Sequence, residues 1–256
     1  MDTIESYRAP DDLLKDRIIA VTGAGDGIGR CMANAFAARG ATVILLGRTV
    51  AKLESIYDEI EQAGYPQAAI FPMNFANSSE EHYQNLQQAV AENFGQLDGL
   101  LLNASTLGDR TSIANYRLET FEQVMRVNVI APFAITKYFL PLLNKSRRGS
   151  IIFTGSSVGL QGRAYWGAYA ASKATTENLM QTLADELEGT SSVRVNSINP
   201  GATRTQMRAD AYPAEDPQTV KSADALETLY LYLMGKDSEG ISGQQFSYDH
   251  IFSAKM

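Results

Sequence analysis

The sequence predicts an α/β fold: a single-domain, doubly wound parallel sheet of about seven strands with helices on both faces. Three observations lead to this prediction. Short runs of β-branched and aliphatic residues alternate with longer amphipathic segments, and strands that alternate with helices pair in parallel. A glycine-rich turn joins the first strand to the first helix. No repeat or linker breaks the alternation, so we expect one domain over residues 1–256, with its core at about 16–248.

The predicted strands are short, mostly apolar runs, as expected for strands buried on both faces. They lie at residues 17–22, 41–46, 68–72, 97–102, 150–154, 193–198 and 245–248. The predicted helices have apolar residues at helical spacing. The first begins near residue 28, and the others span 50–63, 78–94, 118–143, 164–187 and 223–234. Pro132 predicts an interruption within 118–143.

Composition and charge restrict the kind of partner. The formal net charge of -7 disfavours nucleic acid and anionic membranes. The single cysteine, Cys31, excludes a disulfide framework and fits a reducing compartment. The N-terminal residues lack a basic segment followed by an apolar run, and no stretch is apolar over the about 18 residues of a spanning helix. We therefore expect a cytoplasmic protein without a membrane or nucleic-acid partner.

The turn after the first strand carries the most specific chemistry. Residues 22–29 read Thr-Gly-Ala-Gly-Asp-Gly-Ile-Gly. Glycine permits tight turns and lets a ligand approach the main chain, and free N–H groups at the start of the following helix bind phosphate. Strand, glycine turn and helix in this order predict a dinucleotide site in a Rossmann-type fold.

A tyrosine–lysine pair supplies candidate acid–base chemistry. Tyr169 and Lys173 are four residues apart in a predicted helix, and therefore on one helical face. A free tyrosine has a pKa of about 10, and a neighbouring lysine cation, helped by an oxidised nicotinamide ring, lowers that pKa. Ser156, thirteen residues before Tyr169 and just past a strand, is placed to hold a substrate carbonyl. Asn128 lies inside another predicted helix, where an asparagine is often only a solvated or back-bonded residue.

Together these residues resemble the classical short-chain dehydrogenase/reductase family over about residues 16–248. The matching motifs, in family order, are Thr22-Gly23-xxx-Gly27-Ile28-Gly29, Asn103-Ala104, Asn128, Ser156, Tyr169-xxx-Lys173 and Pro200-Gly201. Thr205 stands at the position of the threonine that touches the nicotinamide carboxamide. Within the family, residues 45–48 and 157–169 are similar to those of the bacterial YciK-like oxidoreductases, a subgroup that does not indicate a substrate.

The resemblance implies an NAD(P)-dependent oxidoreductase that transfers hydride between a nicotinamide cofactor and a carbonyl or alcohol carbon. Tyr169 would exchange the proton at the oxygen, and Lys173 would hold the nicotinamide ribose and lower the pKa of Tyr169. Ser156 would orient the oxygen, and Asn128 would anchor a water in the proton relay. The implied cofactor-binding positions are Thr22, Gly23, Gly25, Asp26, Gly27, Ile28, Gly29, Arg48, Asn74, Phe75, Asn103, Ala104, Ser105, Tyr169, Lys173, Pro200, Gly201, Thr203 and Thr205.

Three segments depart from the family pattern. Ser105 replaces a glycine, and we expect its side chain to crowd the adenosine side of the cleft. Asn74, followed by Phe75, replaces an aspartate that contacts adenine, so we expect an altered adenine contact. Residues 248–250, Tyr-Asp-His, replace the usual Asp-Gly-Gly, which leaves the packing of the C-terminal segment open.

The residues after the second strand favour NADP(H), with NAD(H) as the alternative. An acid about 20 residues past the glycine turn would bind a ribose 2′-hydroxyl and select NAD. The sequence instead has Arg48, and no acid until Glu54. An arginine can hold a 2′-phosphate through two parallel hydrogen bonds. Asp26 points the other way, because NADP-dependent members often carry a basic residue there.

Residues 205–223 correspond to the family's mobile substrate lid, and Gln161, Arg163, Tyr165 and Trp166 are candidates to line the pocket. Such arginines and aromatics would suit a medium-sized carbonyl compound, with an acidic group as one option. Trp166 could equally be an interface or core residue. No cluster of potential ligands has metal-binding spacing, so no metal is expected.

Two alternative functions stay open. A sensor or scaffold protein would bind NADP(H) without turnover, but such relatives tend to lose the tyrosine or the lysine. A 3-oxoacyl-carrier-protein reductase would differ only in substrate, and would need a basic docking patch that the acidic net charge does not favour. The family forms homodimers and homotetramers through the long helices after strands four and five, so we expect a homo-oligomer.

Overall fold

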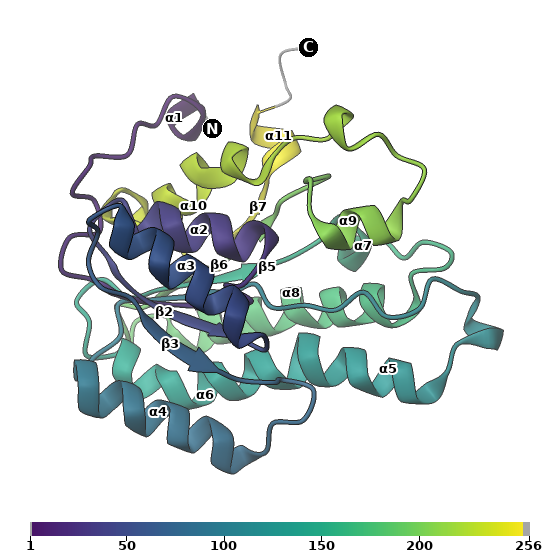
Figure 1. Ribbon diagram of the computed structural model, residues 1–256, viewed down its shortest axis with the longest axis horizontal. Helices are drawn as coiled ribbons and strands as arrows, with labels where there is room; N and C mark the ends of the chain where they lie inside the picture. The colour runs from purple at the N-terminus through teal and green to yellow at the C-terminus, as the bar shows by residue number, and fades with distance from the viewer. Residues whose placement is uncertain (1, 253–256) are drawn as a thin grey trace.

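The computed structural model describes residues 2–252 and confirms the predicted architecture (Figure 1). Seven strands form one parallel sheet in the order β3-β2-β1-β4-β5-β6-β7. They are β1 (Ile18–Thr22), β2 (Thr42–Gly47), β3 (Ala69–Pro72), β4 (Gly99–Leu102), β5 (Ser150–Thr154), β6 (Arg194–Asn199) and β7 (Gln245–Ser247). Every predicted strand is present, within two residues of its predicted ends.

Helices cover both faces of the sheet (Figure 1). One face carries α2 (Gly27–Ala37), α3 (Val50–Gln62) and α10 (Glu227–Met234). The other carries α4 (Glu80–Phe94), α5 (Leu118–Met125), α6 (Ala131–Leu143) and α8 (Gly167–Leu187). The short helices α1 (Asp2–Glu5), α7 (Ser157–Leu160), α9 (Gln206–Ala211) and α11 (Tyr248–Phe252) are additions to the predicted elements. Within residues 2–252, no helix combines the length and apolar character needed to cross a bilayer.

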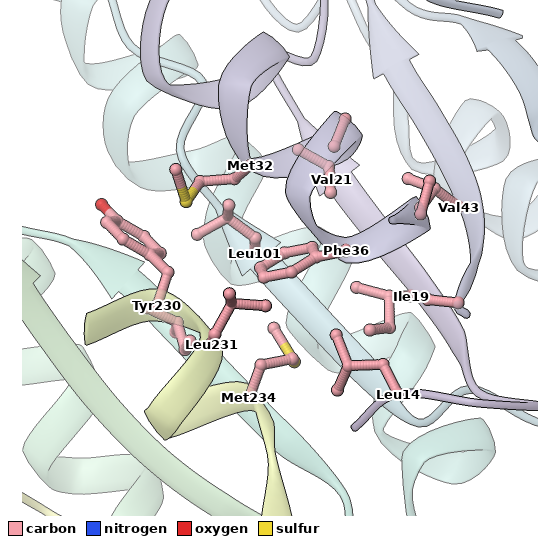
Figure 2. Packing of buried hydrophobic residues seen from close by; sticks show 14 of the residues in the cluster. Leu14, Ile19, Val21, Met32, Phe36, Val43, Leu101, Tyr230, Leu231 and Met234 are labelled. Atoms are coloured by element: carbon pink, nitrogen blue, oxygen red, sulfur yellow. The ribbon is translucent and has the colours of Figure 1, made fainter. Parts of the chain in front are cut away.

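The core between α2, α10 and the sheet explains why these helices dock. Figure 2 shows Met32 and Phe36 of α2 gathered with Leu231 and Met234 of α10 over the strands. Met32 and Phe36 are four residues apart, so both project from one helical face, and both are fully buried. Truncating a side chain such as Phe36 to alanine would cost about 3–5 kcal/mol. The helical spacing read from the sequence therefore marks the face of α2 that packs on the sheet. This packing also positions the glycine turn that precedes α2.

The interruption predicted near Pro132 in the long helix is present. The backbone before Pro132 is already helical, so the N–H that this proline lacks is missing from a continuous helix. The interruption is a π-helical turn over Arg126–Ile130, which contains Asn128 and ends two residues before the proline. Such turns are frequent at functional sites. The predicted start of the next helix is wrong: α8 begins at Gly167, because Tyr165 has a φ of 69°, outside the helical region.

The topology gathers the candidate residues at one edge of the sheet. The chain winds outward from β1 to β3, crosses back to β4, and then winds outward the other way to β7. In open α/β sheets, ligands bind beyond the carboxyl ends of the strands, where the winding reverses. The segments after β1, β4, β5 and β6 carry most of the predicted site residues, and all of them meet there.

Candidate active site

A cleft of about 1020 Å³ opens over the carboxyl ends of the strands. Most of the predicted site residues line it: Gly23, Gly25, Asp26, Gly27, Ile28, Arg48, Asn74, Phe75, Asn103, Ala104, Ser105, Ser156, Tyr169, Lys173, Pro200, Gly201, Thr203 and Thr205. Thr22, Gly29 and Asn128 lie behind this wall. The structure therefore brings almost the whole predicted set into one site.

The glycine turn is packed too closely for side chains at two positions. A Cβ on Gly29 would overlap the carbonyl oxygen of Gly23. Gly23 has a φ of 67°, and a Cβ there would lie 2.9 Å from Cα of Ala104. Helix α2 starts directly after this turn, so its first N–H groups have no partner within the helix. A narrow backbone cradle at a helix N-terminus fits the pyrophosphate of a dinucleotide.

Thr22 supports the turn from behind. Its Oγ1 accepts hydrogen bonds from the backbone N–H groups of Asn103 (2.9 Å) and Ala104 (3.0 Å), and donates to the carbonyl oxygen of Leu101 (3.2 Å). The threonine thus joins the end of β1 to the segment that follows β4. Thr22 therefore contributes to the site by fixing the position of the segment after β4.

The adenosine end of the cleft contains a cation that the sequence did not indicate. Lys52 of α3 lines the cleft and forms an ion pair with Asp26. Asp26 also caps α2, accepting from the N–H of Gly27 at 2.7 Å, and the hydrogen bond from Lys52 is the main cause of its lowered pKa. This ion pair is exposed, with 53% and 56% of the two side chains accessible, so it offsets the charge of Asp26 only weakly. Arg48 is exposed in the cleft and forms no ion pair with any residue from 2 to 252.

Two residues that depart from the family pattern, Asn74 and Ser105, lie in different parts of the site. Asn74 lines the cleft, and its Oδ1 accepts from the N–H of Ala76 at 3.2 Å, which holds the side-chain amide at the cleft wall. Phe75 is 7% exposed and belongs to the core below. The prediction for Ser105 is wrong: its hydroxyl lies beside the Tyr169 phenol and not on the adenosine side, because Asn128 ties the neighbouring Thr106 to Ser172 of α8. The Ser105 Oγ is buried and, within residues 2–252, has no hydrogen-bond partner of normal geometry.

Tyr169 and Lys173 lie on one face of α8, as their spacing predicts. The Lys173 ammonium is 5.5 Å from the centre of the Tyr169 ring and donates to the carbonyl oxygen of Thr154 at 2.7 Å. Lys173 is 3% exposed, and burial lowers its pKa to about 8. Burial raises the pKa of Tyr169 to about 12, while the hydroxyls of Ser156 and Ser105 oppose this rise. The phenol is therefore protonated at neutral pH in the protein alone, and a second charge would be needed to activate it.

Asn128 does not line the cleft, although it lies in the π-helical turn behind it. Its side-chain oxygen accepts from the N–H of Thr106 at 2.8 Å, and its amide nitrogen donates to the Thr106 carbonyl (3.0 Å) and to the Ser172 hydroxyl (3.0 Å). Asn128 is 2% exposed, and both polar atoms of its side chain are hydrogen-bonded to protein groups. Asn128 thus fixes the segment after β4 against α8, one residue away from Ser105.

A buried acid, Glu177, lies next to Lys173 and was not predicted. Glu177 is one helical turn after Lys173, is 4% exposed, and accepts from the Ser197 hydroxyl of β6 at 2.6 Å. Its other oxygen, Oε1, has no hydrogen-bond partner among residues 2–252 and lies against Gly155. The charge of Glu177 raises the pKa of Lys173 and so opposes the effect of burial. The only sequence signal for this role is the spacing of four residues, which is common to many helices.

The model of the short chain dehydrogenase family matches residues 17–216. The chain belongs to the short-chain dehydrogenase/reductase family. It is 50% identical over 240 residues to the uncharacterised oxidoreductase YciK of Escherichia coli K12, covering 94% of each chain. It is 54% identical to a putative short chain dehydrogenase from Pseudomonas syringae, whose solved structure has a TM-score of 0.93 and covers 94% of this chain and 98% of its own. A putative short chain dehydrogenase from Escherichia coli CFT073, solved with NADPH, is 50% identical, with a TM-score of 0.90 and coverage of 93% and 98%.

The far end of the cleft in this short-chain dehydrogenase/reductase is closed by the segment after β6. Thr205 caps α9, its Oγ1 accepting from the N–H of Arg208 at 3.2 Å. Gly201 has a φ of 65°, and a Cβ there would lie 2.5 Å from a carboxylate oxygen of Asp249. Asp249, in the unusual C-terminal segment, itself lines the cleft and pairs with Lys221 at 3.5 Å. The departure at residues 248–250 therefore brings an acid to the site.

The predicted substrate-side residues divide into two groups. Arg163 and Trp166 line the cleft, whereas Gln161 and Tyr165 do not, and Tyr165 is 59% exposed. As a member of this family the protein is an oxidoreductase. Across residues 2–252, no three His, Cys, Asp or Glu side chains come together in a group that could hold a metal ion.

Proposed function

We propose that the protein is an NADPH-dependent reductase that converts a ketone or aldehyde to an alcohol. The observation that carries this proposal is the meeting of Tyr169, Lys173 and Ser156 in the same cleft as the glycine cradle. The reduced nicotinamide, when bound, supplies the hydride that reaches the carbonyl carbon. All other steps belong to this chain's own side chains.

Tyr169 acts as the general acid and gives its phenolic proton to the substrate oxygen. A phenol with a raised pKa is fully protonated at neutral pH and is ready to donate. Ser156, whose hydroxyl is beside the phenol, orients the oxygen. The Lys173 cation, 5.5 Å from the ring, stabilises the phenolate that remains after the transfer. Asn128 contributes by holding the segment after β4 in place. At the π-helical turn it would also anchor a water in the proton relay.

Arg48 would hold the 2′-phosphate of the cofactor, and the glycine cradle would hold its pyrophosphate. Two observations support NADP(H) over NAD(H). Between the end of β2 and Glu54 no acid is present to accept a ribose 2′-hydroxyl, and Arg48 is exposed at this point. The relative solved with NADPH, at 50% identity, supports the same cofactor. Asn74 would contact adenine through its side-chain amide.

Residues 205–223 would form the substrate lid, with α9 as its ordered part. The long helical rod of α5 and α6 supports the proposed homo-oligomer, because Leu118, Ile130 and Phe133 expose 72%, 50% and 55% of their surfaces. Light scattering tests this: a dimer or tetramer should dissociate in Phe133→Glu, and a monomeric wild-type protein would refute it.

The first experiment measures NADPH and NADH oxidation over a panel of ketones, aldehydes and quinones, with Tyr169→Phe in parallel. Turnover that requires Tyr169 and prefers NADPH is expected. Turnover that persists in Tyr169→Phe would refute the acid–base mechanism. Tight NADPH binding without turnover of any carbonyl would instead favour the sensor or scaffold function.

A further inference from the structure

An alternating series of guanidinium and aromatic groups closes the substrate end of the cleft; we call it the arginine stack. The Arg110 guanidinium carbon lies 4.1 Å from the centre of the Trp166 ring and 5.4 Å from that of Tyr212. The Arg208 guanidinium lies 3.8 Å from the same Tyr212 ring. Its Nε and Nη2 pair with both carboxylate oxygens of Glu215, at 2.6 and 2.5 Å. The order is thus Trp166, Arg110, Tyr212, Arg208, Glu215.

The arginine stack joins three parts of the chain. Arg110 belongs to the segment after β4 and donates to the carbonyl oxygen of Ala211, at the end of α9, at 3.0 Å. Trp166 is the residue directly before α8, and Tyr212 directly follows α9. Because Trp166 contacts groups from two other segments, its ring is held in a defined position.

Trp166 is the member of the stack that lies beside the candidate acid. Its ring centre is 5.6 Å from that of Tyr169, with the planes at 50°, and 6.0 Å from that of Tyr212, at 48°. These three rings line the cleft, whereas Arg110 does not. A ligand that brings an oxygen to Tyr169 therefore meets an aromatic wall made of Trp166 and Tyr212, and not the guanidinium behind it.

Most of the cations near this wall are engaged by acids or do not line the cleft, which disfavours an acidic substrate. Arg208 pairs with both oxygens of Glu215. Arg117 pairs with Asp109 at the cleft, and Arg110 does not line the cleft. Arg163 lines the cleft as an exposed side chain, where an ion pair is weak. The remaining wall is aromatic, and its rings are spaced as in tilted or offset aromatic contacts. Each such contact with a ligand ring contributes about two- to tenfold in affinity for that ligand.

We propose that Trp166 determines specificity, and that the substrate is an uncharged carbonyl compound carrying a planar aromatic group. This inference rests on the proposed function and names its substrate class. The planar group lies against Trp166 and Tyr212 while the carbonyl oxygen reaches Tyr169. A saturated ring of similar size occupies the same space but cannot make the flat contact, so the wall discriminates between the two.

The test compares benzaldehyde with cyclohexanecarboxaldehyde, which have the same number of carbon atoms, as substrates with NADPH. The measured quantity is the ratio of their kcat/KM values, in the wild type, Trp166→Leu, Trp166→Phe and Tyr65→Leu. Because the two aldehydes differ in intrinsic reactivity, only the change in this ratio between variants is interpreted. Tyr65 is the matched control: an aromatic that is 38% exposed, follows α3 and lies outside the cleft.

We expect the aromatic-to-saturated ratio to fall about three- to tenfold in Trp166→Leu and to stay within about twofold in Trp166→Phe. It should not change in Tyr65→Leu. An unchanged ratio in Trp166→Leu, or an equal fall in Tyr65→Leu, overturns the inference.

A binding measurement separates this inference from the proposed function. Trp166 is the only tryptophan of the chain, so tryptophan emission reports on this wall alone. Benzyl alcohol titrated into the wild-type protein with NADP⁺ should change that emission at about two- to tenfold lower concentration than cyclohexylmethanol. Equal affinities overturn the inference. If no carbonyl compound is turned over, the proposed function fails, and this titration still decides the inference.

Discussion

Arg48 provides the sharpest test of cofactor choice, because only NADPH carries the phosphate that it would bind. The side chain is exposed in the cleft and forms no ion pair within the described part of the chain, so replacing it breaks no internal contact. A hydrogen bond to a charged group contributes about 1.5–3 kcal/mol, and solvent exposure places Arg48 at the lower end of that range. At 1.4 kcal/mol for each factor of ten, Arg48→Gln should raise the KM for NADPH about ten- to thirtyfold.

The assay is steady-state oxidation of NADPH and of NADH by the wild type and by Arg48→Gln. NADH lacks the 2′-phosphate, so its KM should stay within about twofold. Arg147→Gln is the matched control, since it removes the same charge from an exposed arginine before β5, at the amino ends of the strands. An equal rise in KM for both cofactors would show that Arg48 only shapes the cleft. No rise for either would assign the phosphate to Lys52 or another group.

Further predictions concern the acid–base pair and the glycine turn. Tyr169→Phe should lower kcat by about 10²- to 10⁴-fold without weakening NADPH binding in a fluorescence titration; near-normal kcat would refute the role of the phenol. Since burial lowers the pKa of Lys173 to about 8, kcat/KM for reduction should fall as the pH rises through about 8 and the cation is lost. Glu177 raises that pKa, so Glu177→Gln should move the fall to lower pH; an unmoved profile would contradict this. Gly29→Ala, whose Cβ would overlap the Gly23 carbonyl, should abolish the rise in Tm that NADPH gives the wild type.

The parts of the fold and site that could be predicted are those encoded over short distances in the sequence. The strand Ile18–Thr22 is buried on both faces, so nearly every residue in it is apolar and the run is visible. Tyr169 and Lys173 share one helix, so their spacing alone fixes the side on which they lie. The glycines at 23 and 29 are required by backbone contacts within one turn. In each case a local pattern determines the result.

The parts that could not be predicted depend on how elements dock. The ion pair between Lys52 and Asp26 joins two helices that flank β2, and neither residue carries a signal for the other. Ser105 was assigned to the wrong end of the cleft because the direction of its hydroxyl depends on where α8 packs. Pro132 predicts where the long helix is interrupted, but not that the interruption is a π-helical turn whose Asn128 binds the segment after β4.

Thr22 and Asn128 show why a residue can belong to a catalytic motif without lining the cleft. The segment after β4 leaves the sheet, so its backbone N–H groups lose their ladder partners and must find others. Thr22 accepts from the N–H groups of Asn103 and Ala104, and Asn128 accepts from that of Thr106. The segment is therefore fixed from β1 on one side and from the π-helical turn on the other, with Ser105 between the two anchors. Since an unsatisfied buried N–H costs about 1–3 kcal/mol, removing either side chain would loosen the segment that places Ser105 beside Tyr169. Thr22 and Asn128 would therefore affect the proposed chemistry through the geometry of this segment and not by touching a ligand, which fits their position behind the cleft wall.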